Sequence, residues 1–384
     1  MPRITEEAVR SLVKAEYRAA GWLRRGNILT APPTFGKDDI RAATRSHRKT
    51  RALREQDLVD SQGRDLLIHF ASGQDIRPER FDPELVMVQR DTIESDLFRM
   101  ATLFWSIPVS RGYGRRMRYL IIDRYNDKVV GILALGDPVF NLGARDSHIA
   151  WDHADRAQRL YHVMDAYVLG AVPPYNQLLG GKFIALCAIS DQIRADFSKK
   201  YKRHTTVIDG QRKASSLVLV TTTSALGRSS VYNRIRLPNE NSLAYHSVGF
   251  SRGYGHFHIS DDTFAAMRRW LRQKNDPYAD GHEYGCGPNW RLRTIRRALD
   301  LLGFQGNVMK HGIQREVFMA PLAHNYAEFL RGEHKAPRYY KRPIKAIVEH
   351  YRERWMIPRS IRSDEWTNWR SEDSWNLISA LYAS

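Results

Sequence analysis

The chain has few cysteines, no long apolar run and a shortage of acidic residues, and each shortage excludes a class of protein. Its two cysteines, Cys187 and Cys286, do not form a Cys-x-x-Cys pair, so we expect neither a disulfide scaffold nor a zinc knuckle. No apolar segment is long enough to cross a bilayer, and the first residues lack a signal-peptide pattern. We therefore expect no membrane partner and a reducing, cytoplasmic location.

Basic residues outnumber acidic ones by a wide margin. The 384 residues include 60 Lys and Arg but only 42 Asp and Glu, which gives a formal net charge of +18. This excess points to a polyanion, most simply nucleic acid and DNA in particular, because phosphates attract Lys and Arg. An anionic membrane surface is a weaker alternative, and a basic surface can also serve only to keep the protein soluble. Apolar residues make up 42% of the chain, so it should fold.

The most informative stretch runs from residue 161 to 193. Residues 164–169 have the composition of a strand, a pair of prolines ends it, and apolar residues recur at helical spacing from Lys182 onward. Gly180 and Gly181 lie in the turn between strand and helix. Because the first N–H groups of a helix have no internal partners, such a turn suits a phosphate. A tight turn that binds no ligand explains the same pattern.

The rest of the chain predicts an α/β (α+β) fold, a mixed sheet flanked by helices. Strands are expected at 83–87, 117–125, 128–136, 164–169 and 217–223, with a last strand in 245–260, and helices at 5–20, 37–59 and 91–105. Three regions are expected along the chain. They are a helical basic N-terminal region at 1–82, the sheet-bearing core at 83–275 and a helical C-terminal extension at 276–384.

Three basic segments are candidate contacts for nucleic acid. Helix 37–59 carries positive charge around much of its circumference, which favours phosphate contact but is also compatible with a solvated helix face. The loop at 110–116 joins arginines to a tyrosine, which suits phosphates and a stacked base but also an ordinary flexible turn. A helix that begins near residue 290 adds further arginines. The expected contacts are Arg41, Arg45, Arg48, Lys49, Arg115, Arg116, Arg291 and Arg293.

Histidines and acids gather between residues 255 and 290. His256 and His258 are spaced as on one face of a strand, and either is a candidate general base because imidazole titrates near neutral pH. Neighbouring Asp, His and Cys side chains would offer metal ligands. Their spacing matches no zinc pattern, so we predict no metal site, and a satisfied polar core or a nucleic-acid contact explains the cluster as well.

The strand, turn and helix resemble the GCN5-related N-acyltransferase fold. In that fold a turn of pattern Q/R-x-x-G-x-G/A holds the pyrophosphate of coenzyme A. Here Gln177, Gly180 and Lys182 take the first, fourth and sixth places, with Gly181 before the last, and the lysine departs from the small residue of the pattern. The resemblance implies an acyl-coenzyme A cofactor and, in the segment that supplies a proton donor, Tyr232 as the catalytic acid. More distantly, the turn resembles that of the Mom protein of phage Mu, which modifies adenine in DNA.

Longer runs resemble the DruA family of Druantia anti-phage defence systems. The runs are LGDPVFNLGARD (135–146), VMDAYVLGAVPPYNQLLGGK (163–182), LVLVTTTSALGRSSVYNR (217–234), GHFHI (255–259), GPNWRLR (287–293), HGIQREVFMAPLA (311–323) and ERWMIPR (353–359). This resemblance implies a role in defence against phage, together with other defence subunits. It leaves two functions open. One is a non-catalytic component that binds nucleic acid, and the other is an acyltransferase-like enzyme that modifies a nucleobase in DNA or RNA.

Overall fold

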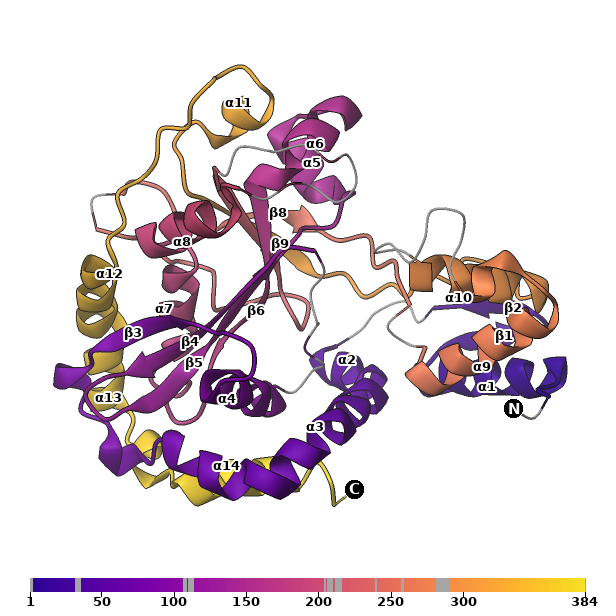
Figure 1. Ribbon diagram of the computed structural model, residues 1–384, viewed down its shortest axis with the longest axis horizontal. Helices are drawn as coiled ribbons and strands as arrows, with labels where there is room; N and C mark the ends of the chain where they lie inside the picture. The colour runs from indigo at the N-terminus through magenta and orange to yellow at the C-terminus, as the bar shows by residue number, and fades with distance from the viewer. Residues whose placement is uncertain are drawn as a thin grey trace.

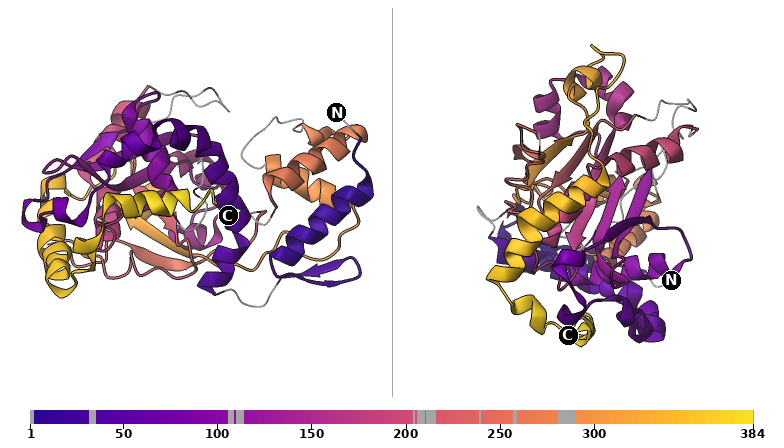
Figure 2. Two further views of the ribbon diagram at one scale, coloured as in Figure 1. Left: turned by 90° about the horizontal axis from the view of Figure 1, so that it is seen from below. Right: turned by 90° about the vertical axis from the view of Figure 1, so that its left-hand side faces the viewer.

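The chain forms a larger body around a β-sheet and a smaller body beside it (Figure 1). The computed structural model describes residues 3–31, 36–105, 109, 114–203, 205, 210, 216–238, 240–256, 259–280 and 290–383. Figure 2 shows the same two bodies from two further sides. The mixed α/β class expected from the sequence is confirmed. None of the described helices combines the length and the apolar character needed to span a membrane.

The larger body is built on one mixed sheet. Its seven strands are β3 (Pro83–Met87), β4 (Arg116–Asp123), β5 (Lys128–Gly136), β6 (Val163–Ala171), β7 (Leu219–Thr223), β8 (His246–Phe250) and β9 (Glu316–Pro321). Their order across the sheet is β3-β4-β5-β6-β7-β9-β8, and β6–β7 is the one parallel pair in it. Neighbouring strands therefore alternate in direction across this sheet, except that β6 and β7 run the same way.

The strand predicted to be the last of the sheet is not the last one. A strand after 245–260 was not expected, yet β9 (Glu316–Pro321) lies in the segment expected to be helical and inserts between β7 and β8. In addition, β8 ends at Phe250, so His256 does not lie on a strand. The other expected strands are present, and β3 and β5 have the expected bounds.

One face of the sheet carries the largest hydrophobic core. It is covered by α7 (Gly180–Cys187), α8 (Asp191–Tyr201) and α12 (Ile344–Tyr351). Aromatic rings fill its centre, where Phe81 lies 5.2 Å from Phe183 and 5.6 Å from Tyr351 between ring centroids. A π-helical segment and α13 (Ile357–Arg362) continue from α12. This core fixes α7, and with it the turn that precedes α7.

The opposite face of the sheet carries two separate cores. One lies under α3 (Arg45–Leu66), α4 (Ile93–Ala101) and α14 (Ser371–Ser379), and the other lies under α5 (Gly143–Ile149), α6 (His153–Arg159) and α11 (Tyr326–Leu330). In Figure 1 the first group lies below the sheet and the second above it. The part of the sheet between these groups is where the candidate site lies.

The basic helix expected at 37–59 is two helices. The chain forms α2 (Lys37–Ala43) and then α3, with a break at Thr44. The Thr44 hydroxyl donates to the carbonyl oxygen of Ile40 at 2.8 Å, which competes with the regular backbone pattern at this point. The arginines of this segment therefore do not share one helix axis.

The smaller body joins the start of the chain to a late segment. It contains α1 (Glu6–Ala19), β1 (Leu23–Arg25), β2 (Ile28–Thr30), α9 (Asp261–Gln273) and α10 (Trp290–Leu301). Thr5 caps α1 as predicted, and its side chain accepts from the Ala8 N–H at 3.2 Å. Residues between 9 and 29 share a core with residues between 259 and 309. The expected boundaries at residues 82 and 275 stay predictions.

Candidate functional site

The turn before α7 brings the four predicted cofactor residues together. Gly180 is buried, and its N–H donates to the carbonyl oxygen of Tyr175 at 2.9 Å. Gly181 is half-buried, and its N–H has no hydrogen-bond partner among the described residues. The Gln177 carbonyl accepts from Arg359 Nε at 3.1 Å. Among the described residues the Gly181 N–H therefore stays without a partner at the head of α7.

Lys182 holds the loop that follows β7. Its Nζ donates to the carbonyl oxygens of Val231 at 2.9 Å, Asn233 at 3.2 Å and Ser230 at 3.3 Å. Burial lowers the pKa of this ammonium group, and the nearby Arg234 lowers it further. Lys182 therefore draws residues 230–233 over the start of α7, and its charge is directed at backbone carbonyls.

Tyr232, the predicted catalytic acid, lies on that loop and is enclosed. Its ring stacks on Tyr245 at 5.1 Å and lies 4.9 Å from Phe318. Burial raises the pKa of its hydroxyl to about 12, against a smaller lowering by the Thr222 hydroxyl. The ring thus packs in the core on the α7 face of the sheet, where aromatic neighbours hold it.

The predicted histidines are not part of this arrangement. His256 lies in the connection to the smaller body, close enough to His311 to lower its pKa. His258 lies outside the described residues, as do Cys286 and its neighbours. In the part of the chain that the structure describes, no three His, Cys, Asp or Glu side chains are placed to hold a metal ion.

Three of the predicted nucleic-acid contacts have internal partners. Arg41 pairs with Asp38 at 2.6 Å. Arg115 pairs with Asp137 at 2.7 Å and donates to a backbone carbonyl at 2.8 Å. Arg291 pairs with Asp261, and burial lowers its pKa to about 10. Arg115 and Arg291 therefore form ion pairs inside the fold. The Arg41–Asp38 pair is exposed and contributes little to the free energy of unfolding.

The remaining predicted contacts lie nearer to solvent. Arg45, Lys49, Arg116 and Arg293 are exposed. Arg48 is half-buried, burial lowers the pKa of its guanidinium, and its Nε is enclosed without a hydrogen-bond partner among the described residues. Neither Arg45, Arg48 nor Arg116 has an acidic partner in the described part of the chain. Their charge is therefore available to a ligand.

A row of residues crosses the sheet between the two cores described above. Arg116 on β4 lies opposite Gly136 on β5, Gly136 opposite Asp165 on β6, and Asp165 opposite Thr221 on β7. Residues that lie directly opposite each other share a face, so Arg116, Asp165 and Thr221 point to the same side. Because Gly136 has no side chain, β5 places nothing between the guanidinium and the carboxylate.

Arginines also lie near Tyr167, which follows Asp165 by two residues on β6. Tyr167 is the extra residue of a β-bulge, and this places it with the core under α3 and α4. Burial raises the pKa of its hydroxyl, while the guanidinium groups of Arg116, Arg118 and Arg51 lower it. Arg118 stacks on a neighbouring ring, and Arg51 pairs with Glu55 at 3.4 Å. We call Arg51, Arg116, Arg118, Asp165 and Tyr167 the Tyr167 cluster.

Asp165 is the residue of this cluster that sequence reasoning missed. Its Oδ1 accepts from the Thr221 hydroxyl at 2.8 Å, and burial raises its pKa to about 6, against smaller opposing effects of Thr221 and Arg145. Arg145 is fully buried and donates to the carbonyl oxygens of Val139 and Phe140 at 2.9 and 2.8 Å. The available signal was an acid inside an otherwise apolar strand, VMDAYVLGA.

Beyond Asp165 the two parallel strands separate. β6 and β7 pair only from Val163 to Asp165, although β6 continues to Ala171. Residues 166–171 therefore have backbone groups on this side that β7 does not pair. The Thr222 hydroxyl donates to one of them, the carbonyl oxygen of Ala166, at 2.9 Å. The separation lies directly beside the Tyr167 cluster.

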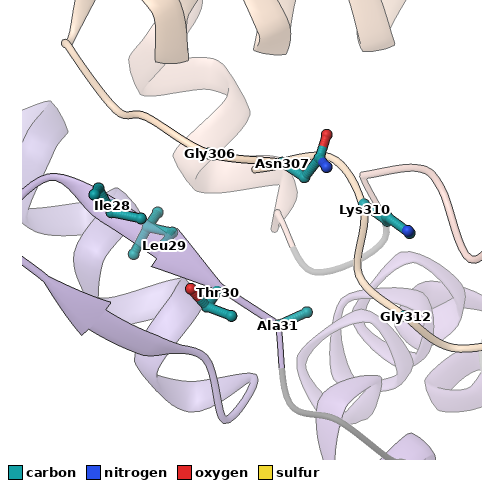
Figure 3. Close-up of a pocket in the computed structure, with 8 residues that line it drawn as sticks. All are labelled: Ile28, Leu29, Thr30, Ala31, Gly306, Asn307, Lys310 and Gly312. Atoms are coloured by element: carbon teal, nitrogen blue, oxygen red, sulfur yellow. The ribbon is translucent and has the colours of Figure 1, made fainter.

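The smaller body contains a pocket of about 370 Å³. It lies between β2 and the segment 306–312, with Thr30, Asn307 and Lys310 among its lining residues (Figure 3). Gln305 bridges to Ile28, and the two segments diverge after that bridge. Its lining includes none of the residues predicted from the sequence, and none of the Tyr167 cluster.

The fold and the cluster define a mixed α/β protein with several arginines beside a half-buried carboxylate. A family model described as Druantia protein DruA matches residues 34–332. The Druantia protein DruA of Escherichia coli (strain UMEA 4076-1) is 44% identical over 377 residues, which cover 98% of this chain and 93% of that protein. No solved structure matches. The chain belongs to the DruA family.

Proposed function

We propose that this chain is the nucleic-acid-binding component of a Druantia-type anti-phage defence system. It holds DNA by its phosphates and acts together with other defence subunits that supply catalysis. The family supports the defence role, and the net charge of +18 supports a polyanionic partner. The binding surface runs from Arg45 and Arg48 on α3 to Arg116 and Arg118 on β4.

One observation carries this proposal, namely that these arginines have no carboxylate partner among the residues that the structure describes. Several less exposed arginines elsewhere do have such partners, as with Arg99 and Glu55 at 2.7 Å or Arg342 and Glu240 at 2.8 Å. A partly desolvated guanidinium without a counter-ion costs free energy. Arg48 bears that cost in the free protein. A phosphate would supply the missing negative charge and accept its N–H groups.

The salt dependence of DNA binding tests the proposal. In the triple variant Arg45→Ala, Arg48→Ala, Arg116→Ala we expect the slope of log affinity against log salt to become less steep by roughly 2–3 units, because each lost phosphate contact removes about 0.9. The free energy of unfolding should not fall, since none of the three has an acidic partner to lose. Fluorescence anisotropy over a salt series and denaturant unfolding measure the two quantities.

The matched control removes three charges that are already neutralised. Arg10, Arg124 and Arg331 are surface arginines paired with Glu6, Glu84 and Glu333 at 3.0, 2.5 and 2.7 Å. Replacing these three by alanine lowers the net charge equally but should leave the slope unchanged. Equal slopes in both triple variants would mean that the α3–β4 surface does not contact phosphates.

A second function is favoured by the separation of β6 and β7. An acyltransferase-like enzyme would place an acyl carbonyl against the unpaired backbone groups of residues 166–171 and the donor's phosphates at the Gly181 N–H. Tyr232 would be the acid, and a nucleobase amine the acceptor. The position of Lys182 argues against this function, because its contacts bring the side chain of Val231 to 3.7 Å from where a Cβ of Gly181 would lie.

Thermal unfolding with acetyl-coenzyme A separates the two functions. We expect no change in Tm, because residues 230–233 cover the turn. A rise in Tm that Gly181→Glu abolishes would instead support the enzyme, since bound ligand stabilises the folded state and the new carboxylate would repel its phosphates. Gly181 suits this test because a side chain fits there. Mass spectrometry of nucleosides from expressing cells would then identify the modified base.

A further inference from the structure

We propose that Asp165 selects unpaired bases that carry an amino group. Its carboxylate accepts a hydrogen bond from the exocyclic amine of cytosine, adenine or guanine, while Arg116 and Arg118 hold the adjoining phosphates. This inference rests on the proposed function, because it requires nucleic acid on the same face of the sheet. It adds a sequence preference that phosphate contacts alone do not provide.

The row across the sheet places the two kinds of contact side by side. Arg116 and Asp165 lie two strands apart on one face, about 10 Å between backbones, with only Gly136 between them. Arg116 is exposed and Asp165 is half-buried, so both are reached from solvent. A nucleotide whose phosphate binds Arg116 would therefore direct its base along β5 toward Asp165.

The carboxylate of Asp165 has capacity to accept a further hydrogen bond. Thr221 donates to Oδ1 at 2.8 Å, and Oδ2 has no hydrogen-bond partner among the described residues. Arg145 does not form an ion pair with it, because that guanidinium is bound by Asp146 and two backbone carbonyls. An ionised carboxylate only accepts, and thymine has no exocyclic amine to donate to it. The one donor of unpaired thymine is its ring N3–H, which lies between two carbonyl oxygens that repel a carboxylate.

The base must be unpaired for this contact. In a duplex each amino group uses one hydrogen in the base pair and points the other into a groove, and the sheet face is too broad to enter a groove as a helix or a two-stranded ribbon does. Single-stranded or extruded bases expose the edge that Asp165 would contact. Tyr167 follows Asp165 by two residues on the bulged strand and is half-buried against the core under α3 and α4.

Binding of short single-stranded oligonucleotides tests the inference. We expect the wild-type protein to bind oligo-dC and oligo-dA about tenfold more tightly than oligo-dT of equal length, since one good base contact contributes about 1–3 kcal/mol. Replacing cytosine by 2-pyrimidinone, which lacks only the amine, should remove that advantage. In Asp165→Asn the advantage of dC over dT should disappear, because an amide both donates and accepts.

Two controls separate this inference from the proposed function. Glu84→Gln removes one negative charge from the exposed edge strand β3, and it should keep the preference for dC. The salt slope should be the same in wild type and Asp165→Asn, because Asp165 contacts no phosphate. If the wild-type protein bound DNA tightly and in a salt-dependent way but showed no preference for dC over dT, the role of Asp165 would be overturned and the proposed function would stand. This outcome is read from the wild-type protein, so it does not depend on whether Asp165→Asn folds. Absence of any DNA binding would overturn the proposed function as well.

Discussion

At the scale of single residues, the two glycines of the turn differ in their surroundings. A Cβ on Gly180 would lie 2.6 Å from the Tyr175 carbonyl oxygen and 2.7 Å from the Ala171 Cβ, whereas a Cβ on Gly181 would lie 3.7 Å from the Val231 side chain. We therefore expect Gly180→Ala to lower the free energy of unfolding by about 1–3 kcal/mol. Gly181→Ala should change it by less than about 1 kcal/mol and in the stabilising direction, because alanine favours a helix. Denaturant unfolding of both variants measures this, and similar losses would contradict the packing described for the turn.

For single residues of the candidate site, the sequence allowed only part of the structure to be predicted. The pattern of the turn predicted a phosphate site at Gln177, Gly180, Gly181 and Lys182, which stays a prediction. It did not reveal that Lys182 is bound by carbonyls that follow β7, because such long-range contacts leave no trace in local spacing. Asp165 was overlooked for a related reason. One acid in an apolar strand is conspicuous, but only the strand register shows that it shares a face with Arg116.

At the scale of elements, local pattern predicted most strands and helices of the sheet body. The strands expected at 117–125 and 128–136 are separated by Asn126-Asp127, a favourable turn pair, and they form the antiparallel pair β4–β5. Residues 316–321 were missed because β9 is buried on both faces, so it shows no alternation of polar and apolar residues. The break at Thr44 was missed because the charge pattern of residues 37–59 continues through it. Both errors concern tertiary context that overrides local preference.

At the scale of the whole molecule, chain order does not follow the two bodies. α1, β1 and β2 pack with α9 and α10, although the entire sheet except β9 lies between them in sequence. The family model covers residues 34–332, so it includes α9 and α10 but not α1. Asp261 at the start of α9 pairs with Arg54 of α3 and so connects the smaller body to the larger one. The hydrophobic cores of the two bodies are nevertheless distinct.

Because the two bodies have separate hydrophobic cores, we expect a destabilising substitution in the smaller body to leave the larger body folded. Tyr17 of α1 is 1% exposed, donates to the Val308 carbonyl at 2.7 Å and lies 4.7 Å from Trp22. We expect Tyr17→Ala to cost about 3–5 kcal/mol. Amide hydrogen exchange should then accelerate in α9 and α10, while β4 and β5 keep their protection, because regions with independent cores open independently.

The control for this prediction lies on the same helix. Leu12 is 41% exposed, so Leu12→Ala should change the free energy of unfolding by less than about 0.5 kcal/mol and leave exchange in α9 unaltered. If Tyr17→Ala exposed β4 and β5 equally, the two bodies would unfold as one unit. The ion pair between Arg54 and Asp261 would then couple the stability of the two bodies more strongly than expected, because a partly exposed pair normally contributes about 0–1 kcal/mol. Preserved protection in β4 would also place the Tyr167 cluster on a scaffold that is independent of the smaller body, so that DNA binding through Arg116 should survive in Tyr17→Ala.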